Sequence, residues 1–373
     1  AAARIGYPVL VRPSYVLGGR GMAIVYDNDQ LDKYMAEAAK ISPDHPVYLD
    51  RFLEAAIEVD VDALCDGKDV FVGGILEHIE MAGIHSGDSA CCTPPFSLSL
   101  SLQGQLRDIA RRLALRLGVV GLLNIQFAIK DQVIYVIEAN PRASRTVPFV
   151  SKSTGVPLAK IAARIMAGEK LADLHLPADD REFDYFCVKE AVMPFGRFPG
   201  SDVVLGPEMK STGEVMGIAG NFPAAFTKTQ LAIDYEPPRG GEVFISVNDG
   251  DKRNITAIAR SVARLGFSLV ATTGTARALR ASGIECEEVG KIHAGSHTIL
   301  DRIASGEIVL MINTPFGSST NTDGYEMRAA CVRHGVSYCT TLAGAQALIA
   351  GMEAVRETGL DVIALQDLPQ WEG

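Results

Sequence analysis

The sequence lacks the features that mark several large classes of protein. No apolar run reaches the roughly 18 residues that a membrane-spanning helix needs, and no secretory signal peptide is recognisable. The formal net charge is −10, whereas nucleic-acid-binding proteins usually carry a basic surface. We therefore expect neither a membrane nor a nucleic acid as a partner.

Cysteine is sparse and follows no redox or metal-binding spacing. The seven cysteines are scattered and contain no C-x-x-C motif. Adjacent Cys91 and Cys92 are compatible with a redox pair, although two free thiols in a buried segment is the simpler interpretation. This usage is typical of a reducing compartment, so we expect a cytoplasmic protein.

The chain is long and apolar. Its 373 residues are 47% hydrophobic, which is enough for two or three domains with substantial cores. It opens with AAARIGYPVLVRP and no methionine. These residues are typical of the last turn of a helix that leads into a strand, so we expect a piece of a longer polypeptide, cut within a domain.

The pattern of elements changes along the chain and predicts three regions. Residues 1–168 mix strand-like runs such as EVDVDALC with amphipathic helices such as QLRDIARRLALRLG. Residues 169–234 are less regular and rich in proline. In residues 235–373, short apolar strands alternate with helices, which predicts a small doubly wound parallel sheet. The fold class expected for the whole chain is therefore α/β and α+β.

The stretch NIQFAIKDQVIYVIEANPRASR, residues 124–145, carries oxygen-bearing side chains at alternate positions of two predicted strands. If a three-residue loop, 130–132, joins the strands, Gln126, Glu138 and Asn140 share one face of the hairpin. Tyr135 and Ile137 then fall on the apolar face. A two-residue loop would separate Gln126 from Glu138.

Such a face suits a divalent metal beside phosphate. Carboxylate and amide oxygens are the hard ligands that Mg²⁺ prefers. Arg142 and Arg145 follow the second strand and suit bidentate contacts with phosphate. The alternative is a merely solvated face, but such faces usually carry lysine, and this one has none. The pattern therefore favours a phosphoryl-transfer site.

Other polar stretches are less specific. The loop with Gly18, Gly19 and Gly21 could bring backbone N–H groups to a phosphate, although a plain hairpin is commoner. It is not a P-loop, because G-x-x-x-x-G-K-S/T is absent, and not a Rossmann turn, because no helix follows. Glu58 could hold ribose or be an ordinary edge acid. EHIEMAGIHSGD fits no zinc spacing, and a polar active-site loop is the better interpretation.

Together these motifs resemble an ATP-grasp domain, and more closely the second, carbamoyl-phosphate-forming half of the carbamoyl phosphate synthetase large-subunit family. The resemblance rests on RPSYVLGGRGM, EVDVDALCDG, EHIEMAGIHSGDSA, NIQFAIK, IEANPRASRTVPF and GPEMKSTGEVMG, all within residues 12–217. It implies an N-terminally truncated ATP-grasp domain that phosphorylates carbamate, feeding pyrimidine and arginine synthesis. The implied cofactors are ATP and Mg²⁺ or Mn²⁺, with K⁺ as a further candidate.

The resemblance also implies roles for individual positions. Adenine would lie at Arg51 and Leu53, ribose at Glu58, and nucleotide phosphates at Arg12 and at the loop of Gly83, Ile84, His85 and Ser86. The divalent metals and the nucleotide would be held at Gln126, Glu138 and Asn140. Arg142 and Arg145 would be the catalytic arginines. In the family, Glu80, Asp88 and Glu190 lie at a site that can bind ornithine.

From about residue 242 the chain resembles the methylglyoxal-synthase-like regulatory domain of the same family. Three loops, SVNDGDKR, ATTGTARAL and INTPFG, follow strands, and open α/β sheets bind ligands at the carboxyl ends of strands. The implied effector positions, for a nucleotide such as UMP or IMP, are Ser246, Lys252, Thr272, Thr275, Lys291 and Asn313. Pro315 departs from one familiar pattern, because proline offers neither hydroxyl nor N–H to a phosphate. The simpler alternative for Thr272–Thr275 is an ordinary helix cap.

Three interpretations remain open. The chain is a carbamate-phosphorylating half-site with a regulatory domain, or an ATP-grasp ligase of another substrate such as a carboxylase, or a nucleotide-sensing and assembly fragment that is inactive alone. TGEVMG and the regulatory segment speak against the second. The resemblance further implies a glutaminase small subunit as partner of the full-length chain, and an oligomer of such heterodimers.

Overall fold

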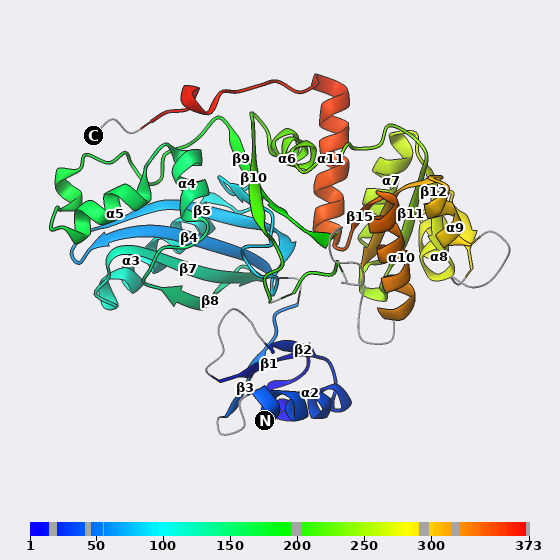
Figure 1. Ribbon diagram of the computed structural model, residues 1–373, viewed down its shortest axis with the longest axis horizontal. Coiled ribbons are helices and arrows are strands. Elements are labelled where there is room, and N and C mark those ends of the chain that lie inside the picture. Colours follow the sequence, from blue (N-terminus) through cyan, green and yellow to red (C-terminus); the bar gives the residue numbers. More distant parts are fainter. Residues whose placement is uncertain are drawn as a thin grey trace. The chain divides into compact units, whose positions relative to one another are not determined.

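The computed structural model describes residues 1–14, 21–41, 46–54, 56–195, 203–206, 208–290, 298–314 and 321–370 (Figure 1). The chain divides into two compact units. Unit 1 comprises residues 1–191, 205–225 and 361–373, and unit 2 comprises residues 192–204 and 226–360. Within the described ranges, every helix is too short or too polar to cross a membrane.

Unit 1 begins with a small antiparallel sheet of order β2-β1-β3. Its strands are β1 (Val9–Pro13), β2 (Ala23–Val25) and β3 (Val47–Arg51), and its helices are α1 (Ala2–Ile5) and α2 (Asn28–Ile41). The side chains of Val9, Val11 and Val25 are fully buried between sheet and helix. The chain therefore opens on a short helix that leads into a strand, as its first residues predict.

The main element of unit 1 is a seven-stranded sheet of order β10-β9-β6-β5-β4-β7-β8. The strands are β4 (Ile57–Asp66), β5 (Val70–Met81), β6 (Cys91–Thr93), β7 (Val120–Lys130), β8 (Val133–Asn140), β9 (Phe186–Val192) and β10 (Gly213–Ala219). The last two strands, and helix α6 (Phe222–Ala232), arise from the stretch that the sequence analysis describes as irregular. That description is wrong here, because pairing with β6, rather than a strong local pattern, defines β9.

Helices cover the two faces of this sheet unequally. Helix α3 (Leu100–Arg116) packs on one face, against Val59, Val61 and Phe127. The opposite face carries α4 (Val147–Thr154) and α5 (Leu158–Met166) (Figure 1), followed by a short 3-10 turn, η1 (Leu171–Asp173). The part of this second face that α4 and α5 leave uncovered carries the polar side chains described below.

Unit 2 contains a five-stranded parallel sheet of order β13-β12-β11-β14-β15. The strands are β11 (Glu242–Val247), β12 (Ser268–Thr272), β13 (Glu287–Val289), β14 (Ile308–Thr314) and β15 (Ser337–Cys339). The helices are α7 (Ile255–Arg264), α8 (Thr273–Ala281), α9 (Ile299–Ala304), α10 (Asn321–His334) and α11 (Leu342–Thr358), with 3-10 turns η3 (Asp249–Asp251) and, in unit 1, η4 (Leu365–Asp367). The strand order reverses between β11 and β14, which confirms the predicted doubly wound sheet.

Two glycines of β5 let α4 and α5 approach the sheet closely. A Cβ at Gly74 would lie 2.7 Å from the buried Val150 side chain of α4, so Gly74→Val should destabilise unit 1 by about 1–3 kcal/mol. Gly104 of α3 is the matched control, because a Cβ there meets open space and Gly104→Ala should stabilise by about 0.5–1 kcal/mol. Urea unfolding measures both. A Gly74→Val chain as resistant to urea as the wild type would contradict this packing.

Candidate active site

The β7–β8 hairpin is closed by a two-residue turn. Asp131 and Gln132 have φ of 50° and 64°, which is typical of a type I′ turn, so the three-residue loop of the sequence analysis is wrong. A β-bulge between Gln126 and Phe127 compensates for the shorter loop. Lys130 pairs with Val133 on the turn side of the bulge, and Gln126 pairs with Glu138 beyond it.

The bulge also changes which side chains of β8 share a face with Phe127. Tyr135 pairs with Ala128, so it lies on the same face as Gln126, and Ile137 has no partner in the register. Both side chains are largely exposed. The prediction that Tyr135 shares the buried face of Phe127 is therefore wrong, because it counts residues through the bulge as if the strand were regular. The register does not assign Ile137 to either face.

The register creates two polar rows across three neighbouring strands. One row is Asp60 of β4, Gln126 of β7 and Glu138 of β8, and the other is Asp62, Asn124 and Asn140. The rows are two residues apart on each strand, so their side chains share one face. The predicted common face for Gln126, Glu138 and Asn140 is therefore confirmed, with Asp60, Asp62 and Asn124 added to it.

The hairpin side of this face has a donor set that fits a hard divalent cation. Asn140 Nδ2 donates to Glu138 Oε1 at 2.8 Å, and Glu138 is exposed while Gln126 and Asn140 are half-buried. One carboxylate and two amides suit Mg²⁺ with phosphate and water completing the shell. In the part of the chain that the structure describes, no three His, Cys, Asp or Glu side chains gather as a metal site.

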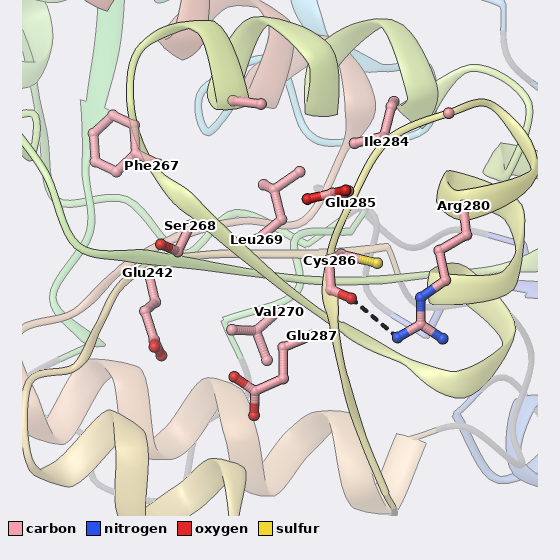
Figure 2. Close-up of a pocket in the computed structure, with 12 residues that line it drawn as sticks. Glu242, Phe267, Ser268, Leu269, Val270, Arg280, Ile284, Glu285, Cys286 and Glu287 are labelled. Carbon is pink, nitrogen blue, oxygen red and sulfur yellow. Dashed lines mark hydrogen bonds between the residues drawn. The ribbon is translucent and has the colours of Figure 1, made fainter.

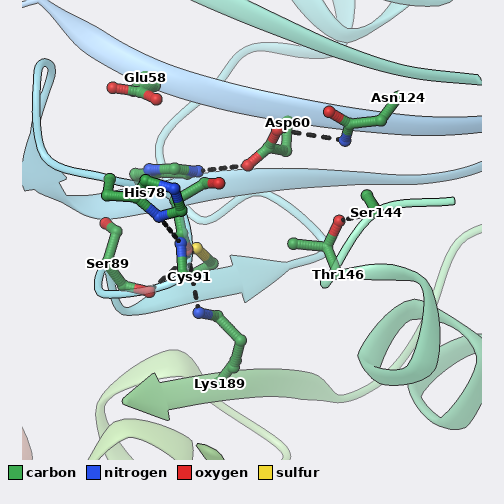
Figure 3. A network of polar contacts seen from close by, with 12 residues as sticks. Glu58, Asp60, His78, Ser89, Cys91, Asn124, Ser144, Thr146 and Lys189 are labelled. Atoms are coloured by element: carbon green, nitrogen blue, oxygen red, sulfur yellow. Dashed lines mark hydrogen bonds and ion pairs between the residues drawn. The ribbon is translucent and has the colours of Figure 1, made fainter. Parts of the chain in front are cut away.

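The other end of the face is a buried hydrogen-bond network (Figure 3). His78 Nε2 lies 2.9 Å from Asp60 Oδ2. Asn124 Nδ2 donates to Asp60 Oδ1 at 3.2 Å and to Asp62 Oδ1 at 3.0 Å. The sequence reasoning missed Asp60, Asp62 and His78 as functional candidates, whereas Asn124 is one of the alternating polar side chains of the hairpin stretch. The available signal was EVDVDAL, in which acids alternate with apolar residues in a strand that is almost wholly buried.

Burial shifts the proton affinities of these groups. It raises the pKa of Asp62 to about 6, against the hydroxyl and amide hydrogen bonds that lower it. It also raises the pKa of Glu58. Burial alone would lower the pKa of His78, but Cys91 and the Asp60 carboxylate outweigh it and hold that pKa well above 6.5. The His78 ring and the Asp60 carboxylate lie in direct contact at 2.9 Å, whereas Asp62 has no cationic partner among the contacts of the described chain.

The predicted nucleotide loop follows β5 and contacts Glu58. Gly83 N donates to Glu58 Oε2 at 3.1 Å, so the predicted ribose position and the loop adjoin. His85 Nδ1 accepts from Gly87 N at 3.0 Å, and burial lowers the pKa of His85. Ile84 is half-buried, and the carbonyl of Ser86 accepts from the buried Lys189 ammonium at 3.2 Å.

The remaining predicted nucleotide residues lie in or beside the small sheet. Arg12 of β1 is half-exposed and pairs with Asp50 at 3.2 Å. Arg51 is the exposed last residue of β3, and Leu53 is half-buried.

The two predicted catalytic arginines, Arg142 and Arg145, lie in the loop after β8 with exposed side chains. The Arg142 guanidinium donates to the Ala143 carbonyl at 2.9 Å, and that of Arg145 contacts the Met209 sulfur.

Most acids of the predicted ornithine site, and Glu77 of the EHIEMAGIHSGD stretch, accept hydrogen bonds from the backbone. Both carboxylate oxygens of buried Asp88 accept backbone N–H groups, from Lys210 at 2.7 Å and Ser211 at 2.8 Å. Glu190 Oε1 accepts from Ala191 N at 3.1 Å, and Glu80 is half-buried at the end of β5. The buried Glu77 accepts from Ser97 N at 2.8 Å.

In unit 2, the predicted effector residues gather at the carboxyl ends of the strands. Ser246 pairs with Asn313 across β11 and β14, and Thr272 Oγ1 lies 3.3 Å from both Ser246 Oγ and Thr275 Oγ1. Thr272 occupies the N-cap of α8 but makes no capping hydrogen bond, so an ordinary cap does not explain it. A Cβ at Gly274 would lie 2.9 Å from the Lys252 ammonium. Lys291 and Pro315 lie outside the described residues, as do Gly18 and Gly19.

A cavity of about 840 Å³ lies at the other end of the strands of this sheet, at the amino ends of β11 and β12 (Figure 2). Glu242 and Ser268, which line it, are the first residues of β11 and β12. Arg280 also lines the cavity and donates to the Cys286 carbonyl at 3.0 Å. None of the described effector positions lines this cavity. Glu242 is engaged by the buried Arg302 guanidinium, so the cavity wall is part of the domain's ion-pair framework.

Comparison with known families agrees with this architecture. Residues 1–174 match the family described as carbamoyl-phosphate synthase L chain, ATP binding domain, and residues 254–340 match the MGS-like domain. The carbamoyl phosphate synthase large chain of Methanothermobacter thermautotrophicus is 54% identical over 375 aligned positions that cover 100% of this chain. That of Pasteurella multocida is 53% identical over 370 positions, 99% of this chain. The chain belongs to the carbamoyl phosphate synthase large chain family.

The chain spans about a third of the length of these relatives, 35% and 34% respectively, and corresponds to their C-terminal part. Two solved structures share the ATP-grasp fold. The biotin carboxylase domain of Hydrogenobacter thermophilus 2-oxoglutarate carboxylase, in complex with MgADP, ADP and bicarbonate, has a TM-score of 0.51 and 20% identity, covering 63% of this chain and 58% of its own. Campylobacter jejuni biotin carboxylase has a TM-score of 0.50 and 18% identity, covering 62% and 58%.

The charge on Asp62 should make unit 1 less stable at neutral pH than in mild acid. Its folded pKa of about 6 exceeds the ordinary 3.8, so the folded chain binds the extra proton and stability falls as pH rises from about 4 to about 6. Asp62→Asn removes this titration but leaves buried donors facing an amide NH2. Its stability relative to wild type should therefore be more favourable at pH 7.5 than at pH 4.5, by about 1–3 kcal/mol. Urea unfolding at both pH values measures this. Equal destabilisation by Asp62→Asn at both would contradict it.

Proposed function

We propose that this chain carries the half-site of carbamoyl phosphate synthesis in which ATP phosphorylates carbamate, giving carbamoyl phosphate and ADP. The observation that carries the proposal is the pairing of Gln126 with Glu138, beside Asn140, in a chain 54% identical to a carbamoyl phosphate synthase large chain. The carboxylase structures are at most 20% identical in the two cases above and share the fold alone.

In this proposal the hairpin face holds the divalent metal and the next loop holds phosphate. Gln126, Glu138 and Asn140 would ligate Mg²⁺ or Mn²⁺, which when bound supplies positive charge beside the phosphate oxygens. Arg142 and Arg145, both exposed, would neutralise charge on the transferring phosphoryl group as catalytic residues. Because phosphoryl transfer needs little covalent help from the protein, positioning and electrostatics suffice.

The nucleotide would extend from this face to the small sheet. Adenine would lie at Arg51 and Leu53, the ribose at Glu58, and the phosphates at Arg12 and at the loop of Gly83, Ile84, His85 and Ser86. The contact between Gly83 and Glu58 supports a shared ribose and phosphate wall. The MgADP named for the Hydrogenobacter domain supports Mg²⁺ with an adenine nucleotide in this fold, and K⁺ remains a candidate additional ion.

We assign unit 1 to catalysis and unit 2 to regulation. Unit 1 takes in residues 169–191 and 205–225 of the expected connecting segment, and residues 361–373 of the expected regulatory domain. Ser246, Lys252, Thr272, Thr275, Lys291 and Asn313 would bind a nucleotide effector such as UMP or IMP, and Glu80, Asp88 and Glu190 would bind ornithine. The full-length chain would receive ammonia from a glutaminase small subunit in the cytoplasm and form an oligomer of heterodimers. The chain on its own would bind effector without completing catalysis.

Glu138→Gln tests the metal face in the full-length large chain. The change keeps the shape of the side chain and removes its charge, so ATP formation from ADP and carbamoyl phosphate should fall by about 100-fold or more. Asp131→Asn is the matched control, because it removes one acid at the far end of the same hairpin and asparagine tolerates a φ of 50°. Full activity of Glu138→Gln would show that the two polar rows form a solvated face and not a metal site.

Lys252→Ala tests the regulatory loop. The Lys252 ammonium lies over the start of α8, where helix N–H groups favour phosphate, so its loss should weaken UMP or IMP binding by about 10- to 100-fold in calorimetry. Arg333→Ala is the control, because Arg333 is an exposed cation in the last turn of α10. Helices of this fold begin near the carboxyl ends of the strands and run back toward the amino ends. The last turn of α10, with Arg333, therefore lies away from the predicted effector residues. Equal losses in both variants would show a general charge effect instead.

A further inference from the structure

The loop that carries Arg142 and Arg145 is tied to the sheet by one buried carboxylate. Asp62 lies in the middle of β4 and has no solvent exposure. Ser144 Oγ donates to its Oδ1 at 2.7 Å, and Thr146 Oγ1 donates to its Oδ2 at 2.5 Å. These two residues, both labelled in Figure 3, flank Arg145 in the sequence, so the two hydrogen bonds hold the backbone on both sides of that arginine against the sheet.

The hydrogen bonds of Ser144 and Thr146 with Asp62 lie at the start of helix α4. Thr146 is the N-cap residue of α4, but its side chain makes no capping hydrogen bond and donates instead to Asp62. The Ser144 hydroxyl lies 2.7 Å from that of Thr146 and accepts from Val147 N at 3.2 Å. The first turn of α4 and the end of the arginine loop therefore share one anchor point on β4.

The same carboxylate reaches the row that contains Asn140. Asp62 Oδ1 accepts from Asn124 Nδ2 at 3.0 Å, and Asn124 pairs with Asn140 across β7 and β8. Asn124 is itself buried. One side chain thus fixes both the loop that bears the two arginines and the strand position next to the hairpin face.

A carboxylate is an expensive anchor at this position. Burying a charge without a cationic partner costs free energy, and Asp62 has hydrogen-bond donors but no ion pair within the described chain. Asp66 on the same strand shows an arrangement in which burying the carboxylate costs less free energy. It accepts backbone N–H groups from Lys68, Asp69 and Leu171, and these hydrogen bonds, acting against burial, lower its pKa.

We infer that Asp62 is a positioning residue for phosphoryl transfer, which holds Arg145 through Ser144 and Thr146 and holds the metal-facing row through Asn124. The inference rests on the proposed function above. Asp62 touches neither phosphate nor metal in this account. It acts by keeping the arginine loop in one place, and a displacement of about 1 Å at such a loop is enough to slow a reaction by about 100-fold.

The test uses ATP formation from ADP and carbamoyl phosphate by the full-length large chain. Thr146→Val removes the donor and keeps the branched shape, and should lower kcat by about 10- to 100-fold with KM for ADP changed less than about threefold. Thr146→Ser keeps the hydroxyl and should retain kcat within about threefold of wild type. Asp62→Asn should lower kcat by a similar factor, and combining it with Thr146→Val should cost no more than the worse single change.

Asp66→Asn is the matched control, since it removes a buried carboxylate from the same strand and should leave kcat unchanged. Equal kcat losses in Asp62→Asn and Asp66→Asn would overturn the inference, as would a Thr146→Val enzyme with wild-type kcat. If Asp62→Asn fails to fold, the Thr146 pair decides.

Hydrogen exchange of the Val147 and Val150 amides, which donate to Ser144 Oγ and to the Thr146 carbonyl, separates this inference from the proposed function. Exchange should be at least about tenfold faster in Thr146→Val than in wild type or Thr146→Ser, whether or not the chain makes ATP. Unchanged exchange overturns the tie. A wild-type chain that makes no ATP but shows the faster exchange in Thr146→Val would reject the proposed reaction while keeping the anchor.

Discussion

The register of β8 against β7 is the constraint on which the candidate site depends. Side chains alternate between the faces of a sheet, so a slip of one residue would move Glu138 and Asn140 to the apolar side. The bulge at Gln126/Phe127 absorbs one residue and brings Glu138 opposite Gln126. The tight turn at Asp131–Gln132 fixes the count on the other side. Turn and bulge together decide that oxygen ligands face one way.

Buried charge is the second constraint, and the strand β4 shows how it is managed. Asp60 contacts His78, and Asp66 accepts from backbone N–H groups. Within the described residues, Asp62 accepts from hydroxyl and amide donors and has no cationic partner. The last arrangement costs the most, and it lies beside the loop of Arg142 and Arg145. Costly polar groups of this kind concentrate at functional sites.

Much of this architecture is predictable from the sequence. Alternating acids and apolar residues in β4, and the strand–helix alternation after residue 235, indicate the two sheets. The shared face of Gln126, Glu138 and Asn140 was predictable, but the route to it was not, because a bulge leaves no mark in the spacing of residues. The roles of Ser144 and Thr146 depend on Asp62, which is 82 and 84 residues away. No local pattern can show such a contact. Strand β9 was likewise not predictable, because its pairing with β6 and not its local sequence defines it.

The most direct test of the central claim is a change of metal preference at Glu138. Thiolates favour soft cations and carboxylates favour hard ones. In the full-length large chain, Glu138→Cys should form ATP from ADP and carbamoyl phosphate with Cd²⁺ but not with Mg²⁺, and Glu138→Ala should form it with neither. A Glu138→Cys enzyme that works equally well with Mg²⁺, or gains nothing from Cd²⁺ over Glu138→Ala, would show that the hairpin face does not hold the metal.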